Sequence, residues 1–140
     1  NPTSSFHLPD SKVMNNNIES NSIMNLCEQI LNLDKSIRFV GISNSIGDVI
    51  TAKYGENVTP LLSGIEAEMS IFQSITRIDS VQAMKDKLGK IIYVAEVFEN
   101  VKRVTIILDS DCFLLVSFNA SADHDSIIMN KITPFVKQMI

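Results

Sequence analysis

The stretch TPLLSGIEAEMSIFQSITRI, residues 59–78, predicts a helix that is apolar around more of its circumference than one sheet can cover. At about 100° per residue, its apolar positions span roughly 220° of the helical wheel. Two other predicted helices keep their apolar residues within about half a turn. The surplus apolar face predicts a partner, most simply a second copy of this chain. We expect the contact to include Leu61, Leu62, Ile65, Glu68, Met69, Phe72 and Ile75.

Glu68 is the one charged member of this set, and it falls inside the apolar arc. An unpaired carboxylate would be costly there if it were buried. Two interpretations stay open. Glu68 pairs across a dimer or lies at its rim, or its stem packs while its head reaches water.

The ends of this helix also carry signals. Thr59 is suited to the N-cap and Pro60 to the first helical position, where its missing N–H costs nothing. The apolar pattern is interrupted near residues 79–80, and a further turn or two should end at Gly89. We therefore predict a kinked or two-part helix.

The flanking segments alternate between helical and β periodicity. A one-faced helix is predicted from Ser20 or Ser22 to residue 31, followed by a hairpin of strands 37–43 and 49–53. Strands 90–98, 101–108 and 113–118 then form a meander. A last helix is capped by Asp123 or Asp125, and Pro134 should kink it or delay its start to about Thr133.

This order, α-β-β-α-β-β-β-α, predicts an α+β fold with a central five-stranded antiparallel sheet flanked by helices. Tight turns cannot connect parallel neighbours, so the sheet must be antiparallel. Residues 1–17, rich in Asn, Ser and Pro, are expected to form a flexible N-terminal tail, and residues 18–140 a single domain.

Composition excludes several classes of protein. A net charge of −4 argues against a nucleic-acid binder. Cys27 and Cys112 are too few for a disulfide framework and lie among apolar neighbours, so we expect buried thiols in a reducing compartment. No run of about 18 apolar residues and no secretory profile is present, so we expect a cytoplasmic protein without a membrane partner.

No pattern of catalytic residues emerges from the chain. It lacks a phosphate-cradling glycine loop and a nucleophile elbow, so we expect no enzyme activity and no cofactor. Asp123, His124 and Asp125 are adjacent and lack metal-ligand spacing, which makes helix capping the better interpretation. Glu96, Glu99, Lys102 and Arg103 bunch around one hairpin and form either a docking patch or a solvated sheet face.

Three segments carry a resemblance to a known family: IRFVG at residues 37–41, LGK at 88–90 and ENVKRVTI at 99–106. With the order of elements, they make residues 26–132 resemble the roadblock, or dynein-light-chain-like, superfamily. The resemblance is nearer to a group of archaeal proteins of that superfamily with no established activity.

The resemblance implies a homodimer or heterodimer in which the middle helix and the third strand, at the sheet edge, pair with their counterparts. Tyr93 in that strand is the further interface residue that it suggests. Roadblock proteins typically act as scaffolds, as regulators of small GTPases or as adaptors in signalling complexes, so a protein partner of that kind is expected.

Two rival interpretations come from other classes of protein. A small-molecule sensor domain of the PAS or GAF kind also combines an antiparallel sheet with helices, but it usually opens with strands and places several short helices between the second and third strands. A profilin-like actin regulator is the other, on fold analogy alone. The single long middle segment favours the roadblock interpretation.

Overall fold

The computed structural model describes residues 25–109 and 111–139. The predicted tail, residues 1–17, and the two predicted N-caps Ser20 and Ser22 lie outside the described residues. The chain is helical at residues 25–31, in agreement with the predicted first helix.

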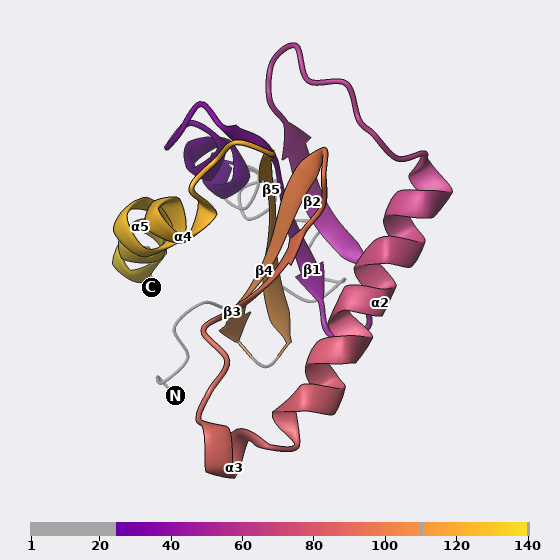
Figure 1. Ribbon diagram of the computed structural model, residues 1–140, viewed down its shortest axis with the longest axis vertical. Helices are drawn as coiled ribbons and strands as arrows, with labels where there is room; N and C mark the ends of the chain where they lie inside the picture. The colour runs from indigo at the N-terminus through magenta and orange to yellow at the C-terminus, as the bar shows by residue number, and fades with distance from the viewer. Residues whose placement is uncertain (1–24, 110, 140) are drawn as a thin grey trace.

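Five strands form one antiparallel sheet in the order β2-β1-β5-β4-β3 (Figure 1). Both predicted hairpins are present, β1 with β2 and β3 with β4, and β5 pairs between β1 and β4. β3 begins three residues later than predicted. The bounds are β1 Ile37–Asn44, β2 Val49–Tyr54, β3 Tyr93–Val97, β4 Val101–Asp109 and β5 Cys112–Asn119. The predicted fold class is confirmed.

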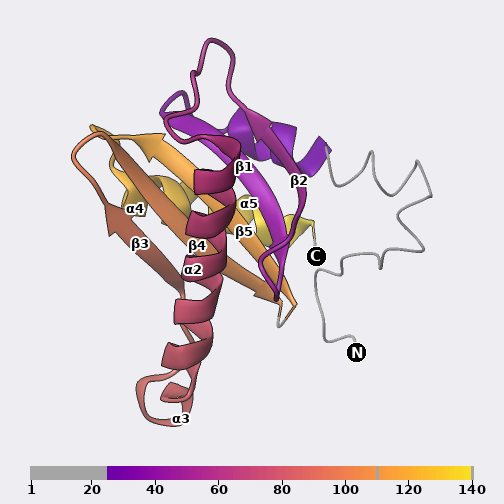
Figure 2. The ribbon, with the colours of Figure 1, turned by 90° about the vertical axis from the view of Figure 1, so that its right-hand side faces the viewer.

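Helices cover both faces of this sheet, as Figures 1 and 2 show. The helical residues 25–31 and the C-terminal helices pack on one face, where they share the larger core with side chains such as Val40, Leu114 and Ile132. α2 (Gly64–Gln82) lies on the other face over a smaller cluster built on Ile75, Ile78 and Phe113. Alternation along each strand divides its side chains between these two cores.

α2 begins at Gly64, four residues later than predicted, so the assignment of Thr59 and Pro60 to the helix start is wrong. Ser63 is the N-cap. Its hydroxyl accepts a hydrogen bond from the Glu66 N–H at 3.2 Å, and its own N–H donates to Glu66 Oε1 at 2.9 Å. This reciprocal capping box gives the backbone N–H groups of Ser63 and Glu66 a side-chain acceptor each. These two hydrogen bonds outweigh the preference of proline for the first turn of a helix. Leu61 and Leu62 consequently lie in the loop before the helix, exposed.

The middle segment is in two parts, as predicted, but the break falls after residue 82 rather than at residues 79–80. Ser80 stays helical, and its hydroxyl donates to the Thr76 carbonyl one turn earlier at 3.4 Å. α3 (Lys85–Leu88) then adds a single turn. Gly89 ends it with a positive φ of 87°, which confirms the predicted glycine stop.

The C-terminal segment runs through α4 (His124–Ile127), a π-helical turn η2 (Ile128–Ile132) and α5 (Thr133–Gln138). Asp123 is the N-cap and accepts from the Ser126 N–H at 3.2 Å, which confirms one of the two predicted caps. Pro134 lies in the first turn of α5. Because proline has no N–H to donate inside a helix, the wider π-helical turn precedes it, and a second α-helical stretch starts at Thr133. The helical segment itself starts at His124, so the predicted delay of its start to about Thr133 is wrong.

Candidate interaction surface

The sheet-facing side of α2 is a conventional core contact. Ile75 is 2% exposed and Ile78 is 1% exposed, and both pack with Phe113 of β5. Partly buried side chains from α2 and the strands close this cluster: Ile71, Ile91, Val94 and Ile107. The core contact therefore uses the positions near Ile71, Ile75 and Ile78 on the helical wheel.

A neighbouring side of α2 is also apolar, and it faces solvent. Ile65 is 72% exposed, Met69 is 58% exposed and Phe72 is 57% exposed. Their spacing of four and then three residues places them on one stripe along the helix. We call Ile65, Met69 and Phe72 the α2 outer stripe.

The loop before α2 extends this apolar surface. Leu61 and Leu62 are exposed just ahead of the Ser63 cap, and Arg38 anchors the loop by donating to the Thr59 carbonyl at 3.1 Å. The β1–β2 turn also touches α2. A Cβ at Gly47, whose φ is +90°, would lie 3.2 Å from the Phe72 Cα, so only glycine allows the turn to approach this closely.

The side chains of two predicted interface residues lie away from the α2 outer stripe. Ile75 is committed to the core of its own chain. Tyr93 packs against the larger core on the far side of the sheet from α2, and its hydroxyl donates to Asp125 Oδ1 at 2.5 Å. The acceptor Asp125 raises the pKa of Tyr93 to about 12. Neither side chain shares a surface with the α2 outer stripe.

Glu68 is exposed, and within residues 25–109 and 111–139 it forms no ion pair. Its head therefore reaches water in the single chain. That placement is compatible with the stem-packing interpretation and with a position at the rim of a dimer.

β3 forms one edge of the described sheet, and β2 forms the other. Within the described residues β3 pairs with β4 alone, so one row of its backbone groups faces away from the sheet. Val97 ends β3 and Phe98 follows it in the β3–β4 turn. Both are exposed, and the Arg103 guanidinium lies 4.9 Å from the Phe98 ring centroid. The edge position that the resemblance implied for the third strand is thus present.

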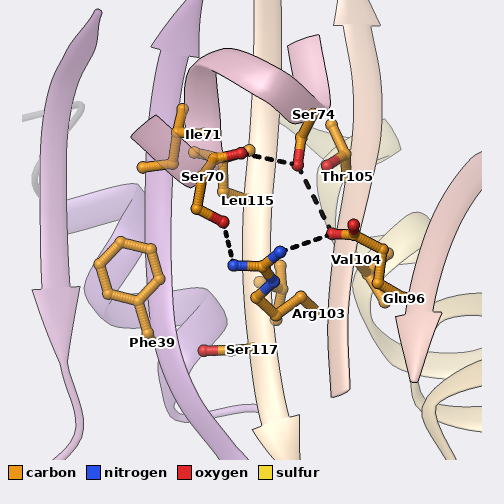
Figure 3. A pocket seen from close by; sticks show the side chains of 11 residues that line it. Phe39, Ser70, Ile71, Ser74, Glu96, Arg103, Val104, Thr105, Leu115 and Ser117 are labelled. Atoms are coloured by element: carbon orange, nitrogen blue, oxygen red, sulfur yellow. Dashed lines mark hydrogen bonds and ion pairs between the residues drawn. The ribbon is translucent and has the colours of Figure 1, made fainter. Parts of the chain in front are cut away.

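Two charged residues of the β3–β4 hairpin, Glu96 and Arg103, belong to a network with α2, and Figure 3 shows their contacts with each other and with Ser70. Glu96 and Arg103 are cross-strand partners with an Nη2–Oε1 distance of 2.9 Å, and Arg77 of α2 reaches Glu96 Oε2 at 3.1 Å. Arg103 also donates to the Ser70 hydroxyl of α2. The network fastens α2 to β3 and β4, so these charges position the helix.

Lys102 does not belong to this network. Its side chain lies on the other side of the sheet, where its ammonium donates to the Ala122 carbonyl at 2.6 Å. Alternation along β4 separates it from its neighbour Arg103. Lys102 is therefore separated from Glu96 and Arg103 by the sheet, and Glu99 lies exposed between β3 and β4, so the predicted four-residue patch is not one surface.

A small cavity lies beneath α2, between Ser70, Ser74, Phe39 and the Glu96–Arg103 pair (Figure 3). Its volume is about 60 Å³. Pockets for organic ligands are on the order of 300–1,000 Å³, so this cavity has room for water and not for the ligand of a sensor domain.

The buried thiols and the ion pairs offer no catalytic chemistry. Burial raises the pKa of Cys27 to about 11 and that of Cys112 to about 12, so both are protonated at neutral pH and poor nucleophiles. Lys131 and Ser36 hold the pKa of Asp34 at about 2 through hydrogen bonds to its carboxylate.

In the part of the chain that the structure describes, no three His, Cys, Asp or Glu side chains are grouped to hold a metal ion. No helix within the same residues is long and apolar enough to cross a bilayer.

Comparison with known proteins defines the class of fold. No protein-family model and no curated protein matches this sequence. Solved structures do match, and they include roadblock/LC7 domains and the proteins MglB and MglC. The chain therefore has the roadblock/LC7 fold.

Three of these structures show the extent of the likeness. MglB, a gliding protein of Thermus thermophilus, has 11% identity and a TM-score of 0.67, with 86% of this chain and 89% of that chain covered. A structure of MglB with a tetrameric arrangement has 12% identity and a TM-score of 0.68, with 86% and 88% covered. The roadblock/LC7 domain of Streptomyces avermitilis has 12% identity and a TM-score of 0.64, with 82% and 92% covered.

Proposed function

We propose that this protein is a non-enzymatic scaffold or regulator that forms a homodimer and binds other proteins. The observation that carries the proposal is the α2 outer stripe, because α2 already buries Ile75 and Ile78 against its own sheet. An apolar row that remains outside after the core is complete is typical of a protein interface.

The open edge of β3 supports the same assembly. Two copies related by a twofold axis would place β3 beside its counterpart, extend the sheet across the dimer and bring the two α2 helices together. This arrangement covers the α2 outer stripe and the exposed backbone of β3 in one contact. Leu61, Leu62 and Glu68 would then lie towards the periphery, where they are free to contact a third protein.

The proposed partner is a small GTPase or a signalling complex that contains one. The support is the roadblock/LC7 fold, together with the sequence resemblance to a superfamily whose members regulate small GTPases. The chain has no phosphate-cradling loop of its own, so any nucleotide hydrolysis would take place on the partner.

The solution mass tests the assembly. Light scattering after size exclusion, over a range of concentrations, should give a mass near twice 15.6 kDa. Met69→Glu should give a folded monomer, because it places a charge in the α2 outer stripe at a side chain that is exposed in the single chain. A wild-type monomer at high concentration, or an unchanged dimer for Met69→Glu, would contradict the proposed interface.

The partner needs a separate test. The purified dimer is titrated with small GTPases of the source organism, each loaded with GDP or with a non-hydrolysable GTP analogue. Binding that depends on the bound nucleotide supports regulation of the GTPase. Failure of every GTPase to bind would refute that partner while leaving the dimer intact.

A further inference from the structure

The far end of α2 carries a second apolar surface, distant from the α2 outer stripe. α3 projects beyond the ends of the strands in both views (Figures 1 and 2). Every residue from 79 to 90 is exposed, so this segment makes no contribution to the core. We call residues 81–92 the α3 tip.

The apolar side chains of the α3 tip follow one another across the break between α2 and α3. Val81, Met84 and Leu88 follow each other at spacings of three and four residues, and exposure rises along them to 72% at Leu88. The Met84 carbonyl accepts from the Leu88 N–H at 2.9 Å, which fixes this turn. Ile92, 66% exposed, follows the Gly89 stop. The tip therefore presents several large apolar side chains on a convex end.

The charge of the α3 tip is opposite to that of the whole protein. Lys85, Lys87 and Lys90 stand against the single acid Asp86, which gives the tip a net charge of +2 in a chain of −4. Within residues 25–109 and 111–139, none of the three lysines forms an ion pair. Their charges are available to an external anionic surface.

We propose that the α3 tip is a membrane-surface anchor that binds bilayers rich in anionic lipid. The exposed apolar side chains would enter the boundary between headgroups and acyl chains, and the nearby lysines would contact the negatively charged headgroups. A second copy of the tip is a poorer occupant, because it would bring like charges together. A convex end also does not form the groove in which an acidic peptide would lie.

This proposal replaces the expectation that the protein has no membrane partner. That expectation rested on the lack of a spanning segment and of a secretory profile in the sequence. Interfacial binding requires neither, since only a few side chains enter the headgroup region. The proposal uses none of the residues of the α2 outer stripe, and its lysine variants leave that stripe unchanged.

Co-sedimentation with vesicles tests the proposal on the full chain. Vesicles of phosphatidylcholine and phosphatidylglycerol at about 60:40 should bind the wild-type protein, and pure phosphatidylcholine should bind it at least about tenfold less. The triple variant Lys85→Glu, Lys87→Glu, Lys90→Glu should lose at least about tenfold in partitioning. A matched control, Lys35→Glu with Lys137→Glu, reverses two exposed lysines elsewhere and should retain most of the binding.

A spectroscopic readout reports insertion separately from attraction. The chain has no tryptophan, so Leu88→Trp introduces a single reporter. Its emission should shift to shorter wavelength on the anionic vesicles, because the indole leaves water. Ile46→Trp, at a position 66% exposed in the β1–β2 turn, should keep its emission under the same conditions. Far-ultraviolet circular dichroism establishes that each variant is folded.

Three results would overturn the proposal. The first is wild-type protein that stays unbound on anionic vesicles. The second is equal loss of binding in the tip triple variant and the control double variant. The third is a tip that drives self-association, seen as a concentration-dependent mass abolished by the lysine substitutions, without any binding to vesicles. The proposal is supported if the wild type and the control double variant bind, the triple lysine variant does not, and Leu88→Trp shows the expected emission shift.

Discussion

Phe72 and Ile75 lie three residues apart on α2, about 60° apart around its axis, yet Phe72 is exposed and Ile75 is buried, so their replacement by alanine should separate assembly from stability. Phe72 is 57% exposed on the outer stripe, and Ile75 is 2% exposed in the core. We expect Phe72→Ala to weaken the dimer while leaving the fold intact, and Ile75→Ala to destabilise the fold.

The exposed fractions give the magnitudes. A phenylalanine side chain has about 200 Å² of surface, so about 110 Å² of Phe72 is free for burial in a dimer. At about 25 cal/mol per Å² this contributes about 3 kcal/mol, of which alanine retains roughly a third. In a twofold dimer both copies carry the substitution, so the loss of binding free energy doubles to about 4 kcal/mol. The dissociation constant should then be about 1,000-fold higher.

Ile75→Ala acts on the single chain instead. Loss of a buried isoleucine side chain typically costs about 2–5 kcal/mol, because the cavity that it leaves closes only in part. At about 3 kcal/mol, Tm should fall by roughly 10 °C for a domain of this size. Because Phe72 is more than half exposed in the single chain, Phe72→Ala should change the free energy of unfolding by less than about 1 kcal/mol.

Two assays measure these quantities. Light scattering over a dilution series gives the dissociation constant, and urea unfolding gives the free energy. Unfolding is followed at concentrations where the protein is monomeric, since dimerisation itself adds stability. Met129→Ala, exposed on the other side of the sheet, is the control for loss of surface apolar area. An unchanged dissociation constant for Phe72→Ala, or equal destabilisation by both α2 variants, would refute the reasoning.

Three further predictions concern the Glu96 ion pairs, the Ser63 capping box and the ion pair between Asp34 and Lys131. Glu96→Gln removes the charge that binds Arg103 and a second arginine, so urea unfolding should show a loss of about 1 kcal/mol, and an unshifted midpoint would rule out a stabilising network. Ser63→Ala removes the capping box, and amide hydrogen exchange in the first turn of α2 should quicken with a loss of about 1 kcal/mol; unchanged exchange would contradict it. Because Lys131 holds the pKa of Asp34 at about 2, below its ordinary 3.8, this stabilisation is present above about pH 4 and lost as the pH falls towards 2. Asp34→Asn should therefore cost about 1 kcal/mol at pH 7 and little at pH 2, and an equal cost at both would contradict the assignment.

The strands could be predicted from the sequence because their signals are local. Each has a β-rich run bounded by Asn, Gly or Asp, and tight turns left only antiparallel pairing. The start of α2 was mispredicted because Thr59-Pro60 and Ser63-x-x-Glu66 are competing start signals a few residues apart. The capping box was visible in the sequence, and its two reciprocal bonds make it the stronger signal.

A helical wheel alone could not predict which apolar residues of α2 remain exposed. The wheel measures how wide the apolar arc is, and it does not say which part of the arc the sheet covers. Ile71, Ile75 and Ile78 occupy the part that the fold buries, which leaves Ile65 and its stripe outside. The side of the sheet on which Tyr93 lies depends on the register of β3 against β4, and no local sequence signal fixes that register.

The place of β5 at the centre of the sheet determines when this protein can fold during synthesis. β5 is the last strand made, yet it pairs with both β1 and β4, and Ile37 is aligned with Phe118 across 81 residues of chain. The two hairpins can form as they leave the ribosome, but no strand pairing joins them in the described sheet until β5 has emerged. The larger core closes only when the C-terminal helices follow, so a nascent chain stalled before β5 exposes two unjoined hairpins to chaperones and to other nascent chains.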